Sequence, residues 1–143
     1  MPTDEDFADV LAANSTFAAG FRAAPLAARA AKELAVLTCF DSRIDPLRML
    51  GLAPGDAKIL RNAGGRVTED VLRTLVVAVH LLDVRRVMIV EHTHCRVAGC
   101  SEEDVHEAIA ERGGPDTRSI SFLTSRDQEV AVQTDVQRVH SWP

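Results

Sequence analysis

Polar residues of chemically active types follow two apolar segments of this sequence. Cys39 lies at the end of one segment, and His92 and Cys95 come just after another. Two thiolates and one imidazole are a donor set that suits tetrahedral zinc, and the short spacing of His92 and Cys95 lets one turn supply two ligands. Three protein ligands leave a fourth position open, as in catalytic zinc sites. The pattern therefore predicts one catalytic Zn²⁺ per chain.

Asp41 and Arg43 lie within a few residues of Cys39 and extend this prediction. A carboxylate beside a guanidinium stays ionised and is held by paired hydrogen bonds. Asp41 could then orient a water molecule at the metal, or take the fourth metal position when its contact with Arg43 is broken. Two alternatives stay open on the residues alone. The thiols and the imidazole could be ordinary core residues, and Asp41 with Arg43 could be a surface ion pair.

The elements that must position these residues are indicated by apolar patterning. Short apolar runs without polar alternation are typical of strands buried in a parallel sheet, and they occur at residues 34–40, 57–60 and 87–90. Helices are predicted at residues 46–51, 71–82, 101–112 and 126–139. The helix at 71–82, capped by Thr68, is apolar on nearly every side and is expected to be largely buried. The last helix has valines at 130, 132, 136 and 139 as candidate packing positions.

This alternation of strands and helices predicts an α/β fold, with a parallel-sheet core flanked by helices. Functional groups in such folds gather at the carboxyl ends of the strands, so neighbouring first and third strands would bring the three candidate ligands together. Residues 1–33 are predicted to form an N-terminal helical arm with a break between Gly20 and Pro25. The arm could pack on a partner subunit or on its own domain. Residues 34–143 would then be a single α/β zinc-binding catalytic domain.

Length and composition limit the possible functions. The chain has 143 residues, which fits one catalytic domain with a short arm. With 16 Lys and Arg against 21 Asp and Glu, the net charge is −5, a poor match for nucleic acid or for anionic membranes. We expect neither as a partner. An odd count of three cysteines without an export signal predicts a cytoplasmic protein with free or metal-bound thiols.

Three segments together resemble the β-class carbonic anhydrases, most closely their small bacterial members. They are Cys-Phe-Asp-Ser-Arg at 39–43, Arg-Asn-Ala-Gly-Gly at 61–65 and His-x-x-Cys at 92–95. The resemblance implies a zinc lyase that hydrates CO₂ reversibly to bicarbonate and a proton by means of hydroxide at the metal. It also implies a homodimer or a dimer of dimers. By position, Cys39, His92 and Cys95 would be the zinc ligands, and Asp41 and Arg43 the catalytic dyad.

The same resemblance implies a substrate pocket and shows some departures. Gly64 and Gly65 would form a backbone loop beside the metal, with Phe40 and Val67 as apolar walls for CO₂. Arg96 stands where the family usually has glycine, and it would be strained if its φ were positive. The chain also looks short at its C-terminus, since relatives continue into another strand. A hydrolase of carbonyl sulfide or carbon disulfide, or a catalytically silent zinc- or bicarbonate-binding relative, is the alternative function.

Overall fold

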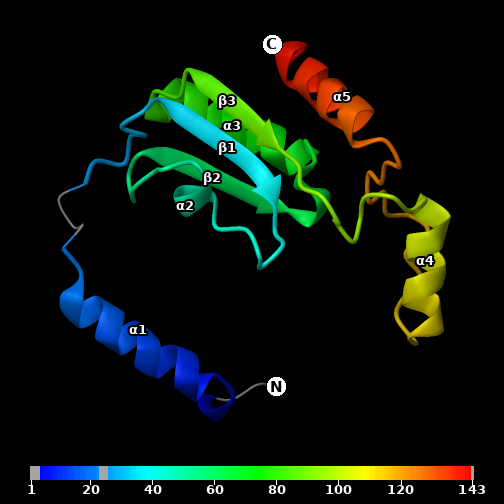
Figure 1. The fold of residues 1–143 in the computed structure, drawn as a ribbon, viewed down its shortest axis with the longest axis horizontal. Helices are drawn as coiled ribbons and strands as arrows, with labels where there is room; N and C mark the ends of the chain where they lie inside the picture. Colours follow the sequence, from blue (N-terminus) through cyan, green and yellow to red (C-terminus); the bar gives the residue numbers. More distant parts are fainter. Residues whose placement is uncertain (1–3, 23–25, 143) are drawn as a thin grey trace.

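The computed structural model describes residues 4–22 and 26–142, and its centre is a three-stranded parallel sheet (Figure 1). The strands are β1 (Leu34–Cys39), β2 (Ala57–Asn62) and β3 (Arg86–Val90), in the order β2-β1-β3. All six residues of β1 are buried, because this strand has a neighbour on each side and packing on both faces. The predicted parallel α/β core is confirmed, with the first and third strands as direct neighbours.

Helix α3 (Glu69–Leu82) supplies most of the core beside the sheet. Thr68 caps it by accepting a hydrogen bond from the Val71 amide at 3.3 Å, as predicted. Its inner side buries Val71, Leu72, Leu75 and Ala78 against the strands. The expectation that α3 is largely buried is wrong for this chain. One side of the helix faces outward, and its apolar side chains are 38–71% exposed at Val76, Val77, Val79 and Leu81.

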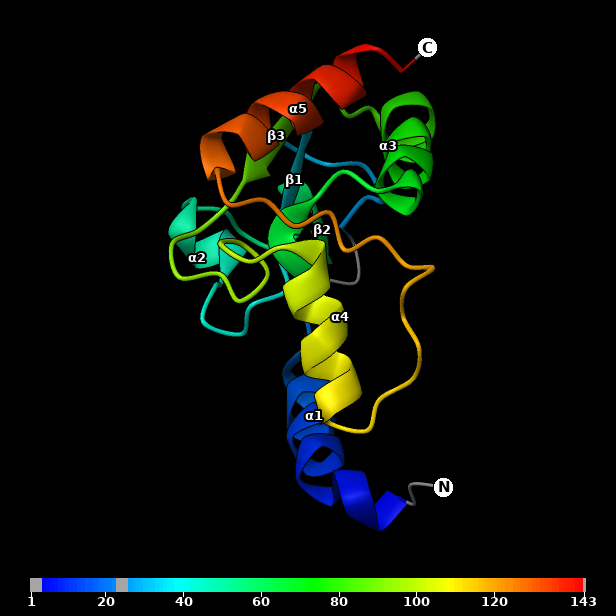
Figure 2. The ribbon, with the colours of Figure 1, turned by 90° about the vertical axis from the view of Figure 1, so that its right-hand side faces the viewer.

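Helix α5 (Gln128–His140) lies beside β3 (Figure 2). The predicted valine positions are only partly right. Val139 packs against the core, whereas Val130 is 54% exposed and Val136 is 37% exposed. The buried residues of this helix are Ala131 and Asp135 instead. Asp135 can be buried because Arg66 binds its carboxylate.

The other helices are short or stand apart from the sheet. Helix α2 (Pro46–Met49) is capped by Asp45, and α4 (Glu102–Glu111) begins with a capping box between Ser101 and Asp104. Helix α1 (Ala8–Gly20) follows a 3₁₀ turn at Asp4–Phe7 and buries none of its side chains. Figures 1 and 2 both show α1 away from the sheet. Part of the predicted break after Gly20, residues 23–25, lies outside the described residues.

None of the helices in the described ranges is long and apolar enough to cross a membrane.

Candidate metal centre

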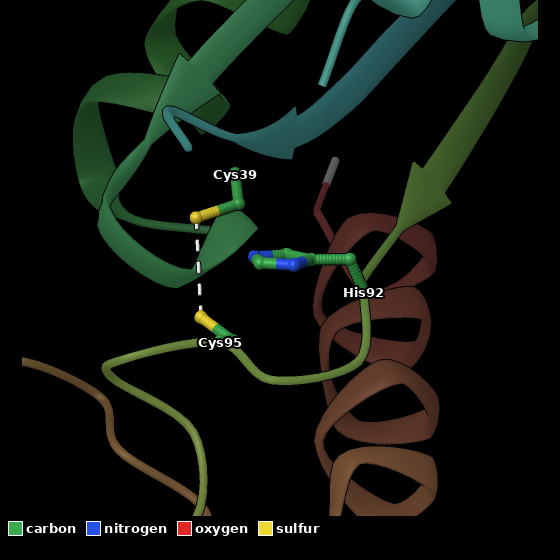
Figure 3. A group of neighbouring side chains, drawn as sticks. All are labelled: Cys39, His92 and Cys95. Carbon is green, nitrogen blue, oxygen red and sulfur yellow. Dashed lines mark hydrogen bonds between the residues drawn. The ribbon is translucent and has the colours of Figure 1, made fainter. Parts of the chain in front are cut away.

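Two thiols and an imidazole meet at the carboxyl ends of β1 and β3 (Figure 3). Cys39 is the last residue of β1, and His92 and Cys95 lie in the loop that follows β3. One ligand atom from each residue lies within 4.8 Å of the others, and the two sulfur atoms are 3.9 Å apart. The predicted convergence is confirmed. Cys39, His92 and Cys95, called the ligand group below, could hold a metal ion.

The imidazole of His92 is oriented as a ligand for a metal. Its Nδ1 is 2.9 Å from the Thr93 carbonyl oxygen, which can only accept, so Nδ1 carries the proton. This leaves a lone pair on Nε2. Nε2 is buried and has no hydrogen-bond partner among the described residues. A buried nitrogen lone pair between two thiols is costly unless something binds it, and the donor set suits zinc.

Asp41 and Arg43 form a paired contact at the edge of the ligand group. Arg43 donates from Nε to Oδ1 at 2.9 Å and from Nη2 to Oδ2 at 2.6 Å, and its backbone amide donates to Oδ1. These bonds hold the pKa of Asp41 well below its ordinary range. Oδ2 is 3.9 Å from His92 Nε2. An ionised carboxylate is therefore fixed beside the place where a metal would lie.

Arg61 fixes the segment that carries Cys39 and Asp41. Its guanidinium donates from Nε to the Cys39 carbonyl at 3.0 Å and from Nη2 to the Asp41 carbonyl at 2.7 Å. Sequence reasoning included Arg61 in a motif but gave it no role. The alternating direction of side chains along β2 allows the last residues of that strand to reach across to β1.

The loop after β2 approaches the backbone of Cys39 very closely. Gly64 and Gly65 have φ values of +79° and +66°, which favour glycine. A Cβ atom on Gly65 would lie 3.0 Å from the Cys39 amide nitrogen and 3.1 Å from the Thr38 carbonyl carbon. The loop therefore lies against the Cys39 end of β1, and a Cβ atom at Gly65 would be crowded there. The role of Gly64 and Gly65 as a backbone loop beside a bound metal stays a prediction.

Comparison with known proteins decides the family. Residues 34–137 match the family model described as carbonic anhydrase. The chain belongs to the β-class carbonic anhydrase family. It is 39% identical over 106 residues to beta-carbonic anhydrase 1 of Mycobacterium tuberculosis, a match that covers 74% of this chain and 64% of that protein. The chain therefore spans less than two thirds of that relative's length.

Solved structures and other relatives agree with this family. The carbonic anhydrase of Streptococcus mutans has a TM-score of 0.89 and 34% identity, covering 96% of this chain and 82% of that one. A carbon disulfide hydrolase of Acidianus is 35% identical over 82 residues, covering 57% of this chain and 40% of that protein. Relatives of this chain are thus named for two different substrates.

The residues predicted to line the substrate pocket, and those at which the chain departs from the family pattern, differ in how exposed they are and where they lie. Phe40 is 62% exposed and directly follows Cys39 in the chain, whereas Val67 is fully buried in the core. Their role as pocket walls stays a prediction. Arg96 does not have a positive φ, so its backbone is not strained, and the left-handed residue of this loop is His94 at +56°. Cys100 lies outside the ligand group and contacts the Val97 carbonyl through Sγ.

Sequence reasoning missed a buried ion pair next to the centre. Arg66 donates to Asp135 from Nε at 2.6 Å and from Nη2 at 3.2 Å, and both side chains are nearly inaccessible to solvent. Asp135 also accepts from the Val67 amide at 3.2 Å. The two partners are 69 residues apart, so no local spacing could have indicated the pair.

Proposed function

We propose that this protein is a zinc-dependent carbonic anhydrase that interconverts CO₂ with bicarbonate and a proton. The observation that carries the proposal is the group of Cys39, His92 and Cys95 with the Asp41–Arg43 pair at its edge. Both halves of this arrangement come from segments that the family match covers. We also propose that residues 34–143 form the zinc-binding catalytic domain, with one Zn²⁺ per chain.

Cys39, His92 and Cys95 would hold the metal in this reaction. When bound, Zn²⁺ lowers the pKa of a water molecule and so supplies hydroxide at neutral pH for attack on CO₂. Asp41 would accept a hydrogen bond at Oδ2 from this hydroxide and thereby orient it toward CO₂. Arg43 keeps the Asp41 carboxylate ionised and holds it in its orientation. The exposed ring of Phe40 offers CO₂ an apolar contact beside Cys39.

A second substrate is supported by the likeness to the Acidianus carbon disulfide hydrolase. Carbon disulfide and carbonyl sulfide are linear molecules like CO₂ and are open to the same attack at carbon. The ligand group and the Asp41–Arg43 pair would serve either substrate. The difference would come from the walls of the entry, of which this chain supplies Phe40.

We propose a homodimer or a dimer of dimers, with the arm of residues 1–33 packed on a second copy. In the described part of the arm, α1 buries no side chain. The large apolar residues within this helix and at its two ends are 46–63% exposed: Phe7, Val10, Leu11, Phe17 and Phe21. Packing such a helix on another surface removes its apolar side chains from water, which is favourable. We place the protein in the cytoplasm, because free cysteines such as Cys39, Cys95 and Cys100 are typical of a reducing compartment.

The test of function measures zinc and turnover on the same sample. We expect about one zinc per chain and CO₂ hydration far above the buffer rate in stopped flow at mildly alkaline pH. Cys39→Ser should lose the metal and the activity together. Full zinc occupancy without CO₂ hydration would contradict the proposal, and turnover of carbon disulfide by that sample would favour the second substrate.

A further inference from the structure

Helix α5 contacts the metal centre through the backbone of a ligand residue. Gln128, in the first turn of α5, donates from Nε2 to the His92 carbonyl oxygen at 2.8 Å. The two residues are 36 positions apart in sequence. Figure 3 shows α5, drawn in faint red-brown, running past the loop that carries His92 and Cys95. The side chain of Gln128 thus fixes the main chain from which the His92 imidazole projects.

The loop that Gln128 holds needs fixed points because its backbone is not in a relaxed conformation. His94 has a φ of +56°, a value that side-chain-bearing residues adopt at a cost of about 1–2 kcal/mol. The carbonyl oxygen of His94 accepts from Arg43 Nη2 at 3.2 Å. Two carbonyls of the loop are therefore held from outside it, one by Arg43 and one by Gln128. Arg43 belongs to the segment at 39–43, whereas Gln128 lies in α5, outside the three segments that carry the resemblance.

The same helix also fixes the other half of the centre. Asp135 is two turns beyond Gln128 on the same side of α5 and binds Arg66 and the Val67 amide. These residues directly follow Gly65, whose backbone lies against Cys39. One rigid helix is thus bonded to the loop of His92 and to the loop behind Cys39, which sets the two halves of the ligand group relative to each other.

We propose that Gln128 is a positioning residue of the metal centre, which aims the His92 imidazole by holding the His92 carbonyl. The inference rests on the proposed zinc centre. Groups that orient metal ligands without touching the metal typically change metal affinity 10- to 100-fold when removed. Gln128 acts through one neutral hydrogen bond to the backbone, so its loss should weaken zinc binding about 10-fold, the lower end of that range.

The experiment compares Gln128→Met with Gln133→Met in the full chain. Methionine keeps the length of the side chain but cannot donate a hydrogen bond. Gln133 is an exposed residue of the same helix, and its amide donates to the Glu129 carboxylate at 3.5 Å, outside the ligand group. The affinity for Zn²⁺ is measured by competition with a chromophoric chelator. Urea unfolding of the zinc-free forms is measured beside it, because a purely structural residue would change that stability and leave the affinity alone.

We expect Q128M to bind zinc about 10-fold more weakly than the wild type, with Q133M unchanged. The zinc-free forms of the two variants should unfold alike. Equal zinc affinities of Q128M and Q133M would overturn the inference while leaving the zinc centre in place. A lower zinc-free stability of Q128M at wild-type affinity would also overturn it. A wild-type chain that binds no zinc would overturn the proposed function itself, and this inference with it.

Discussion

Replacing Gly65 by alanine tests whether the loop after β2 is fixed by its contact with Cys39. Two separate costs arise in this variant. The positive φ of +66° costs an alanine about 1–2 kcal/mol. The added Cβ would lie 3.0 Å from the Cys39 amide nitrogen, a backbone atom of a fully buried strand that has no room to move. Overpacking of this kind costs about 1–3 kcal/mol, so the sum is about 2–5 kcal/mol.

Gly51 provides a matched control because its φ of +64° is nearly the same, and a Cβ there would meet nothing within 4 Å. Gly51→Ala should therefore cost only about 1–2 kcal/mol. Urea denaturation of both variants gives the free energies of unfolding, and zinc analysis reports on Cys39. We expect a larger loss of stability and reduced zinc binding for G65A. If G65A and G51A lose the same stability and keep the same zinc, close packing against Cys39 is not what fixes the loop.

Asp41→Asn should retain zinc but lose most CO₂ hydration, because it removes the ionised oxygen that orients the attacking group; wild-type turnover in this variant would refute that role. Asp135→Ala should destabilise the protein by about 3–5 kcal/mol in urea, because it leaves the Arg66 guanidinium buried without its partner, whereas an apolar pair at both positions should recover most of the loss. Burial alone would raise the pKa of Glu102, but hydrogen bonds from the Phe122 and Thr124 amides lower it overall. Its folded pKa is below the ordinary 4.5, so its contribution is present above that pH and is lost as the pH falls. The stability difference between wild type and Glu102→Gln should therefore shrink in acid, and a difference independent of pH would contradict this.

The sheet and the ligand group could be predicted because local patterns specify them. The run at 34–40 has no polar alternation, which is typical of a strand buried on both faces, and β1 is such a strand. Once β1 and β3 are parallel neighbours, the residues that follow them must meet at one edge of the sheet. The positions of Cys39, His92 and Cys95 follow from this topology without any knowledge of side-chain contacts.

Other features could not be predicted because they depend on partners distant in sequence. The local sequence predicts that Asp135 faces solvent, because its partner Arg66 lies 69 positions earlier in the chain. The hydrogen bond from Gln128 to the His92 carbonyl also joins residues that are distant in sequence, 36 positions apart. The apolar pattern of α3 does not say which of its sides the sheet covers, and Leu81 is 71% exposed. The residue with a positive φ after β3 is His94 rather than Arg96, and its carbonyl accepts a hydrogen bond from Arg43, which lies 51 positions earlier in the sequence.

The strand order has a consequence for the time at which the centre can form in the cell. The first strand to be synthesised, β1, is the middle strand of the sheet, and Cys39 leaves the ribosome 56 residues before Cys95. At about 5–20 residues per second, that delay is roughly 3–11 s. During this interval the nascent Cys39 thiol has neither β3 nor His92 and Cys95 beside it. In the proposed zinc centre, metal binding by all three residues would therefore be a late step of biogenesis, which becomes possible only after Cys95 has left the ribosome.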